Sequence, residues 1–459
     1  MKYRPEIDGL RAFAVVPVIL NHANLPYFAG GFIGVDIFFV ISGYLISKII
    51  YADVIAGQFS IFIFYERRIR RIFPALLVVL AFSFTAAHLL MLPDPYENFT
   101  QSVIATLLFS NNLLLAMTSG YWQLESAFKP LLHTWSLGVE EQFYIFYPIL
   151  VMLAARFSKR WLISALVFGA IVSFGLSVGL SGRYPDASFY LLHTRAWELL
   201  IGALVATIDV QVISKRINGP AAAVGLALIL VCIVSVSEGI EYPGYIALLP
   251  CLGAALVIVF ATSETFVHRL LSQGPLVAIG VISYSAYLWH QPIFAFARIS
   301  SVREPSLFLM ILLSASTLAV AYLSWRYVET PFRSKSRFSR NQIFAYASTG
   351  SAILITGAFT VYSLGGLPER VPGIGLGHGS YIAYNERVFE LKKDSFSTRG
   401  KPHLMVAGNS TGRDLVNVLI ESGRFDKFEI IYRDDISICL PDKLSNVQSK
   451  LVNQSDAII

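Results

Sequence analysis

The amino-acid sequence predicts an all-α polytopic membrane bundle followed by a short, truncated α/β domain. Apolar residues make up 55% of the 459 residues and charged residues only 14%, whereas soluble domains carry about 25% charged residues. Residues 365–459 contain 12 basic and 12 acidic side chains, so residues 1–364 carry the whole net charge of +6. These proportions predict a membrane-embedded first part with a soluble tail, and they exclude an intrinsically disordered chain.

The small counts exclude other classes of protein. The 3 cysteines have no CxxC or His-rich spacing, so we predict neither a disulfide framework nor a metal site. The basic residues lie between apolar segments, which indicates membrane orientation and no nucleic-acid partner. The N-terminal apolar segment is followed by no small-residue cleavage site, so we interpret it as a retained span and not as a signal peptide.

Eleven apolar segments approach the length of roughly 20 residues that a membrane-spanning helix needs. They are residues 9–25, 31–51, 73–92, 137–155, 162–180, 190–208, 219–237, 244–262, 277–298, 306–327 and 341–363. The segment 97–117 is apolar but contains Gln101, Asn111 and Asn112, so we interpret it as a partly immersed helix and do not count it. The lipid bilayer is therefore the first predicted partner.

The loops between these segments predict an orientation. Arginine and lysine concentrate in alternate loops, most densely at residues 67–71 and 333–340, and such loops face the cytoplasm. The N-terminus is then cytoplasmic, and an odd number of spans places residues 365–459 on the other side, which is the periplasm for a bacterial inner membrane. We find no internal repeat of the kind that many transporters contain.

The first span carries two ionisable residues, Arg11 and His22. At about 100° per residue they lie within about 20° of one helix face, about 16 Å apart along the axis. Polar groups in a membrane usually face the bundle interior, so we interpret them as the two ends of a stripe for a long ligand, with a phosphate at Arg11 and the reactive end at His22. The alternative is an arginine that extends to the interface and a histidine bonded in the core.

Three further charged groups allow a structural or a functional interpretation. The arginine cluster 67–71 could anchor the topology, or it could clamp phosphate, because the guanidinium fork matches phosphate oxygens. Asp36 lies in the apolar second span and needs a partner, which we expect to be an arginine or histidine of the first span. Arg195 and Glu198 are three residues apart, the spacing of an internal ion pair, and we interpret that pair as structural.

Polar side chains also lie near the ends of later spans. The stretch 129–144 contains His133, Glu140 and Glu141, and a carboxylate there could accept a proton or orient a histidine. Adjacent glutamates on a helix point about 100° apart, so we expect at most one of them to face a site. His290 in the ninth span could line a polar cavity or lie at the interface.

Six separated strings together carry a resemblance to a known family. They are RPEIDGLRAFAVVPVILNH, GGFIGVDIFFVISGYLI, FYERRIRRIFPAL, KPLLHTWSLGVEEQFY, SYSAYLWHQP and VETPFR. In this order they resemble the integral-membrane acyltransferase-3 family across residues 1–335, which would hold about ten spans. The arginine-pair motif of that family maps to Arg68 and Arg71, and its recurrent glutamate maps to Glu141.

The resemblance implies an acyl-CoA co-substrate, usually acetyl-CoA, that is bound from the cytoplasmic side. By this resemblance Arg11, Arg68 and Arg71 would bind its phosphates. The free energy changes little when an acyl group passes from a thioester to a hydroxyl. Positioning and proton transfer should therefore determine the rate.

The resemblance also implies roles for the other candidates. His22 would be the catalytic histidine, acting as a general base on a hydroxyl or as a relay residue. Glu141 would orient His22, stabilise its cation or contact the acceptor. Asp36, His133 and His290 would be supporting residues.

The predicted reaction is therefore acyl transfer to a hydroxyl of a cell-envelope glycan such as lipopolysaccharide O-antigen. One alternative is a relay, in which the membrane part passes acetyl groups outward and the tail completes the transfer. Another is a transporter or flippase for a lipid-linked sugar, against which stand the absence of repeats and the arginine cluster on one side only.

The remaining sequence predicts an extra span with a linker at residues 336–364 and a periplasmic domain at residues 365–459. HLMVAGNSTGRDLVNVL, from His403, predicts a strand, a turn and a helix, and it resembles the start of an SGNH-hydrolase domain with Ser410 at the nucleophile position. Ser410 could instead only cap the helix. Residues 456–459 predict another strand, after which such a domain would need its Asp and His, so we expect either that the chain is a fragment or that the domain is incomplete.

Overall fold

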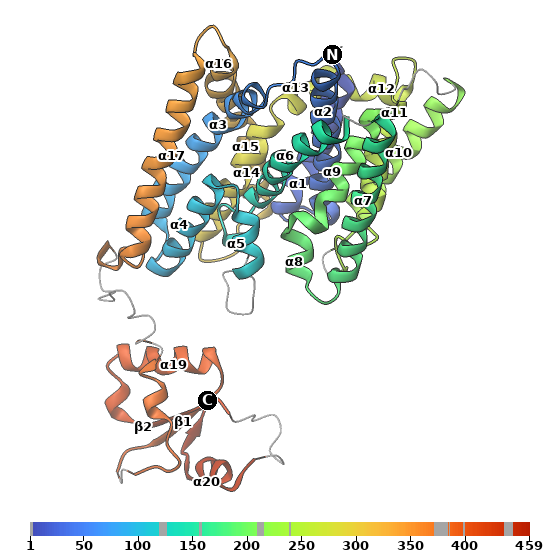
Figure 1. Cartoon of the computed structure of the whole chain (residues 1–459). Coiled ribbons are helices and arrows are strands. Elements are labelled where there is room, and N and C mark those ends of the chain that lie inside the picture. Colours follow the sequence, from blue (N-terminus) through green and yellow to red (C-terminus); the bar gives the residue numbers. More distant parts are fainter. Residues whose placement is uncertain are drawn as a thin grey trace. The chain divides into compact units, whose positions relative to one another are not determined.

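The chain folds as a helical bundle and a separate, smaller α/β unit (Figure 1). The computed structural model describes residues 3–118, 126–155, 158–208, 215–237, 240–370, 384, 386–397, 400–435 and 444–459. The bundle extends to Tyr362, and the smaller unit begins at Ser363.

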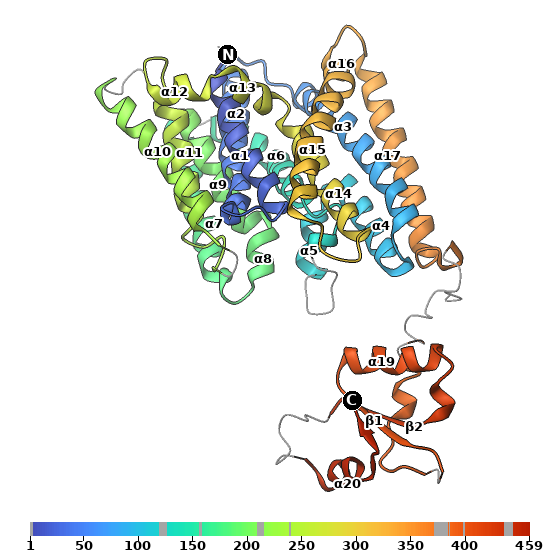
Figure 2. The ribbon, with the colours of Figure 1, turned by 180° about the vertical axis from the view of Figure 1, so that it is seen from behind.

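The bundle consists of long helices side by side and shorter helices at its two ends (Figures 1 and 2). Its first half contains α1 (Pro5–His22), α2 (Gly34–Ile55), α3 (Ile61–Leu90), α4 (Pro93–Leu107), α5 (Asn111–Thr118), α6 (Thr134–Ala155), α7 (Lys159–Ser181), α8 (Pro185–Tyr190) and α9 (Leu192–Thr207). Its second half contains α10 (Lys215–Ser235), α11 (Leu248–Phe260), α12 (Phe266–Leu271), α13 (Gly274–Val281), α14 (Ser283–Ile299), α15 (Leu307–Ser324), α16 (Thr330–Arg333) and α17 (Arg340–Ser363). The N-terminus lies at the same end of the bundle as α12, α13 and α16, and α4, α5 and α8 lie toward the opposite end.

The predicted helical membrane bundle is confirmed in its main feature, because each of the eleven predicted segments contains a helix. Within the described part of the chain, 7 helical segments are long and apolar enough to cross a membrane. They are Ala29–Ile55, Ile61–Leu90, Thr134–Ala154, Lys159–Ser181, Lys215–Ser235, Leu307–Arg333 and Arg340–Ser363. The number of crossings stays a prediction.

Two segments differ from the sequence-based expectation of one continuous helix each. The polar segment 97–117 forms α4 and α5, separated by residues 108–110. The predicted ninth span 277–298 is divided at Ile282 into α13 and α14. The second break begins α14 inside the bundle, at Ser283.

Serine caps and close glycine contacts explain how the helices begin and pack. The hydroxyls of Ser60, Ser158 and Ser306 accept hydrogen bonds from backbone N–H groups three residues further on, which satisfies donors that the first helical turn leaves free. A Cβ on Gly43 of α2 would collide with the carbonyl oxygen of Leu199 in α9. Small residues of this kind allow helices in membranes to approach closely.

The smaller unit is a parallel α/β arrangement. It contains β1 (His403–Ala407), α19 (Ser410–Glu421), β2 (Glu429–Arg433), α20 (Asn446–Gln454) and β3 (Ala457–Ile458). Both β2 and β3 pair with β1 in parallel, in the order β2-β1-β3. The predicted strand, turn and helix from His403 and the predicted last strand are therefore confirmed, and the SGNH-like fold stays a prediction.

Candidate functional site

A cavity lies inside the bundle and is lined by residues of α1, α2, α3, α6 and α14. We call it the inner cavity. Its polar and charged lining includes Arg11, Ser42, Arg68, Arg71, Thr134, Ser136, Glu140, Tyr144, Ser283, Tyr284 and Tyr287. Phe38, Phe39, Leu45, Ile46 and Ile49 of α2 form much of its apolar wall. Such a mixed lining is typical of a small-molecule or cofactor site.

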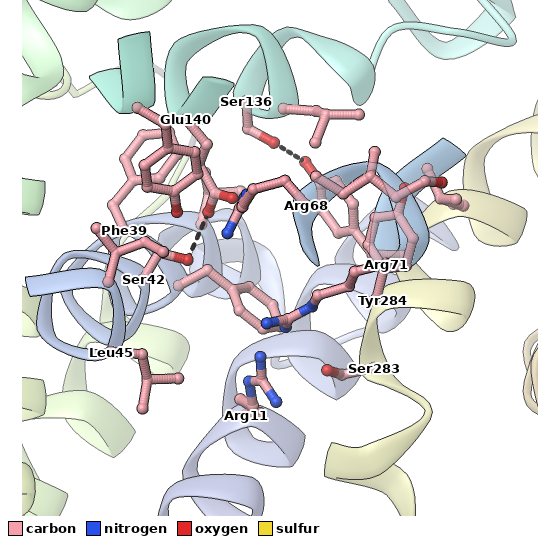
Figure 3. Close-up of a pocket in the computed structure, with 18 of the residues that line it drawn as sticks. Arg11, Phe39, Ser42, Leu45, Arg68, Arg71, Ser136, Glu140, Ser283 and Tyr284 are labelled. Atoms are coloured by element: carbon pink, nitrogen blue, oxygen red, sulfur yellow. Dashed lines mark hydrogen bonds between the residues drawn. The ribbon is translucent and has the colours of Figure 1, made fainter. Parts of the chain in front are cut away.

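Three guanidinium groups converge on this cavity from two helices (Figure 3). Arg68 and Arg71 are three residues apart on α3 and therefore share one helix face. Arg11 comes from α1, whose backbone approaches α13 so closely that a Cβ on Gly280 would collide with the carbonyl oxygen of Asp8. The predicted grouping of these three arginines is thus seen in the structure.

The three arginines differ in the partners they have. Arg68 forms an ion pair of 2.6 Å with Glu141, and its guanidinium carbon lies 3.9 Å from the centre of the Tyr144 ring. Arg11 lies 3.3 Å from Asp8. In the described part of the chain, Arg71 has neither a hydrogen bond nor an ion pair, whereas Nε of Arg11 and Nε of Arg68 are donors without a partner on side chains that are otherwise bonded.

A pair of histidines lies where the C-terminal end of α1 meets α14. His22 Nδ1 is 2.9 Å from His290 Nε2, and His290 Nδ1 is 2.6 Å from the carbonyl oxygen of Tyr287. A carbonyl oxygen only accepts, so His290 Nδ1 carries hydrogen and, in the neutral ring, His290 Nε2 accepts from His22. This assignment leaves Nε2 of His22 without hydrogen, which is the form a general base needs.

The buried side chain of Arg298 holds the end of α1 that carries His22. Arg298 of α14 donates to the carbonyl oxygen of His22 at 2.7 Å, and its side chain is 2% exposed. A cation at the last carbonyl groups of a helix is favourable, because it opposes the negative end of the helix dipole. Arg298 was not among the sequence-based candidates, because it is the last residue of the predicted span 277–298 and no predicted partner lay beside it.

Tyr287 lies between the inner cavity and the histidines. Its side chain lines the cavity, and its ring contacts those of His133 and His290 with centroid separations of 5.5 and 5.3 Å. Its hydroxyl is 2.7 Å from Ser136 Oγ and donates to the carbonyl oxygen of His133 at 2.9 Å. His22 is not among the described residues that line the cavity, so the expected continuous path from Arg11 to His22 is interrupted here.

Glu141 bonds Arg68, and the group bonded to His22 is His290. A direct contact between Glu141 and His22 is therefore not seen, and the predicted contact of Glu141 with the acceptor stays a prediction. Of the two adjacent glutamates, Glu140 lines the cavity and accepts a hydrogen bond of 2.8 Å from Ser42. The sequence could not distinguish the two glutamates. The helical period gives the angle between them, but it does not tell which other helix each one faces.

The expected partner of Asp36 is also wrong. Asp36 accepts a hydrogen bond of 2.7 Å from Arg195 of α9 and another from Tyr242, and it does not bond a residue of α1. The predicted pair of Arg195 and Glu198 is confirmed, with 3.1 Å between Nη1 and Oε1. These residues are not among the described residues that line the inner cavity, and their structural role stays a prediction.

Ser410 is the first residue of α19 and follows the end of β1 by three positions. Its side chain lies outside the described part of the structure. Asn409 caps this helix, because its side chain accepts from the N–H of Thr411 at 3.4 Å. In the described part of the chain, no three His, Cys, Asp or Glu side chains are placed to hold a metal ion.

Comparison with known proteins identifies a family. A family model described as an acyltransferase domain matches residues 4–326, which is most of the chain. The chain belongs to this acyltransferase family.

Among its relatives is the O-acetyltransferase OatA of Staphylococcus aureus strain MRSA252, which is 31% identical over 386 residues, or 78% of this chain and 64% of OatA. The putative O-acetyltransferase SAS0844 of strain MSSA476 is 31% identical over 393 residues, or 79% of this chain and 64% of the relative. The chain thus spans a little less than two thirds of these curated relatives. No solved structure matches it.

Proposed function

We propose that the chain is an O-acyltransferase of a bacterial inner membrane that transfers an acetyl group from acetyl-CoA to a hydroxyl of a cell-envelope glycan. Lipopolysaccharide O-antigen is one acceptor to test. The proposal places the N-terminal end of the bundle in the cytoplasm and residues 365–459 in the periplasm. It is supported by the family and by relatives that are named O-acetyltransferases.

The single observation that carries the proposal is the position of Arg71. A guanidinium without a carboxylate partner lies between Arg11 and Arg68 beside the inner cavity (Figure 3). Burying an uncompensated charge is costly, so such a cation is best explained by an anionic ligand that completes the site. The phosphates of the donor would be held here by charge-assisted, bidentate hydrogen bonds.

The histidine pair would supply the proton transfer. Nε2 of His22 takes the proton of the acceptor hydroxyl while the oxygen forms a bond to the thioester carbonyl carbon. The carbon–sulfur bond then breaks, and the CoA thiolate takes up the proton that His22 holds. His290 keeps the His22 ring in the required tautomer, and rotation of Tyr287 would join the inner cavity to this pair.

The test supplies acetyl-labelled acetyl-CoA to membranes that contain wild type, His22→Ala or Arg71→Ala, and follows label into glycan. We expect both variants to lose transfer while the amount of folded protein stays constant. Exposed His193 and Arg160 give matched controls, because His193→Ala and Arg160→Ala change neither group of residues. A lipid-linked sugar transporter would give no label in any sample, and full transfer by His22→Ala would refute the role of His22.

A second candidate is a relay through the tail, favoured by the position of Ser410 at the start of α19 directly after a parallel strand. A nucleophile at a helix N-terminus can use its partial positive charge. A relay predicts labelled protein in wild type and none on the tail of Ser410→Ala, with glycan labelling lost. Direct transfer predicts unchanged glycan labelling by Ser410→Ala.

A further inference from the structure

A second cavity opens at the N-terminal end of the bundle. We call it the outer vestibule. Its basic lining residues are Arg11, Arg67, Arg70, Arg71, Arg333 and Lys335. It shares four residues with the inner cavity, namely Arg11, Arg71, Ser283 and Tyr284. The two cavities therefore adjoin, and a ligand longer than the inner cavity would extend into the vestibule.

Most cations of the vestibule already have a carboxylate partner. The pairs are Arg11–Asp8 at 3.3 Å, Arg67–Asp53 at 3.6 Å, Arg70–Glu66 at 3.0 Å and Arg333–Glu329 at 2.6 Å. In the described part of the chain, Arg71 and Lys335 have no such partner. Arg71 lines both cavities and Lys335 lines only the vestibule, so the uncompensated positive charge lies at two separate places.

The surroundings of Arg71 and of Lys335 differ. Beside Arg71, the break at Ile282 begins α14 at Ser283, which lines both cavities. The N-terminus of a helix adds partial positive charge there, in addition to the guanidinium groups of Arg11 and Arg68. Lys335 follows α16 at the rim, where its exposed ammonium is a mobile point charge.

We propose that the outer vestibule is a second anion subsite, in which Lys335 binds the 3′-phosphate of the donor nucleotide while the arginines of the inner cavity bind its pyrophosphate. Arg67 supports it, because its 3.6 Å separation from Asp53 is too long for a hydrogen bond and its side chain is half exposed. This inference rests on the proposed function, because it requires a coenzyme A thioester as the donor. It adds that the protein discriminates that donor from its 3′-dephospho form.

The experiment compares acetyl-CoA with acetyl-3′-dephospho-CoA in proteoliposomes of neutral lipid that contain the full chain. We expect wild type to prefer acetyl-CoA at least tenfold in kcat/KM, and Lys335→Ala to reduce this preference severalfold, through KM for acetyl-CoA. Lys335→Arg should restore part of it. Lys159→Ala is the matched control, because Lys159 is an exposed lysine that lines neither cavity.

Anionic lipid headgroups have the same phosphate chemistry, and a second arm separates them from the donor. If the vestibule binds lipid, Lys335→Ala lowers activity equally with both donors, and only in vesicles that contain phosphatidylglycerol. That result overturns the inference, and so does a wild type that uses both donors equally well. Absence of transfer from either donor would instead refute the proposed function itself.

Discussion

Arg195 and the three partly buried arginines of the inner cavity lie in the same bundle and differ in what balances their charge. Arg195 contacts two carboxylates, Asp36 at 2.7 Å and Glu198 at 3.1 Å, and its side chain is 1% exposed. Its guanidinium carbon also lies 5.5 to 5.8 Å from the centres of four aromatic rings, a range in which cations and rings attract. This cluster has two carboxyl groups around one guanidinium.

The arginines of the inner cavity are balanced differently, and Glu140, which lines the same cavity, bonds Ser42. Arg11, Arg68 and Arg71 have two carboxylate partners between them, Asp8 and Glu141, and all three line open space. The comparison teaches that burial alone does not distinguish a structural arginine from a binding one. The number of carboxylates around it and the presence of a cavity do.

The largest expected effect is loss of the fold in Arg195→Met. Removing the guanidinium leaves the buried carboxyl groups of Asp36 and Glu198 without their cation. Breaking a buried pair in this way lowers the free energy of unfolding by about 3–5 kcal/mol. Thermal unfolding in detergent, followed by tryptophan fluorescence, measures the change. Arg71→Met is the contrasting variant, because it removes no carboxylate's partner. An unaltered unfolding temperature for Arg195→Met would contradict the assignment of this cluster as structural.

The next effect is on catalysis without a change of fold. We expect His22→Ala to lower kcat by about two to four orders of magnitude, the usual range for loss of a general base, with little change in KM for acetyl-CoA. His290→Gln should retain more activity than His290→Ala, because the glutamine oxygen can still accept from His22 Nδ1. Steady-state kinetics of the three variants test this, and equal activity of the two His290 variants would exclude a positioning role.

A smaller effect is expected for Arg71→Gln. Loss of a hydrogen bond between charged groups costs about 1.5–3 kcal/mol, which corresponds to about a 10- to 150-fold rise in KM for acetyl-CoA. The unfolding temperature should not fall, because Arg71 has no protein partner to lose. Arg68→Gln should lower both affinity and unfolding temperature, because it leaves Glu141 buried without its partner. If the two variants behaved alike, the contrast between free and paired arginines would not hold.

The smallest effect is expected within the Arg195 cluster itself. One guanidinium cannot compensate two carboxylates, so one carboxyl group should be neutral. Asp36 accepts from both Arg195 and Tyr242, which leaves Glu198 as the neutral one. Glu198→Gln should therefore cost under about 1 kcal/mol, and Asp36→Asn about 1–3 kcal/mol. Unfolding temperatures measure both changes. If Glu198→Gln were more destabilising than Asp36→Asn, Glu198 would be the charged carboxylate and Asp36 the neutral one.

The candidate residues that the sequence identified were grouped only in part as expected. Arg68 and Arg71 share a face because a helix fixes the direction of residues three apart, so their convergence could be predicted. The same rule placed Arg11 and His22 on one face of α1. It gave no information on Tyr287, which comes from α14 and lies between the cavity and the histidines.

The sequence by itself determined the helical membrane bundle, the start of the α/β tail and the arginines that face inward, because apolar length and helical period are local properties of a chain. Only the tertiary structure decided that His22 meets His290 and that Asp36 meets Arg195, 268 and 159 residues apart. It also decided that Glu140, and not Glu141, lines the cavity. Partners of buried polar groups are set by how helices pack, and a single sequence carries no record of which helix lies beside which.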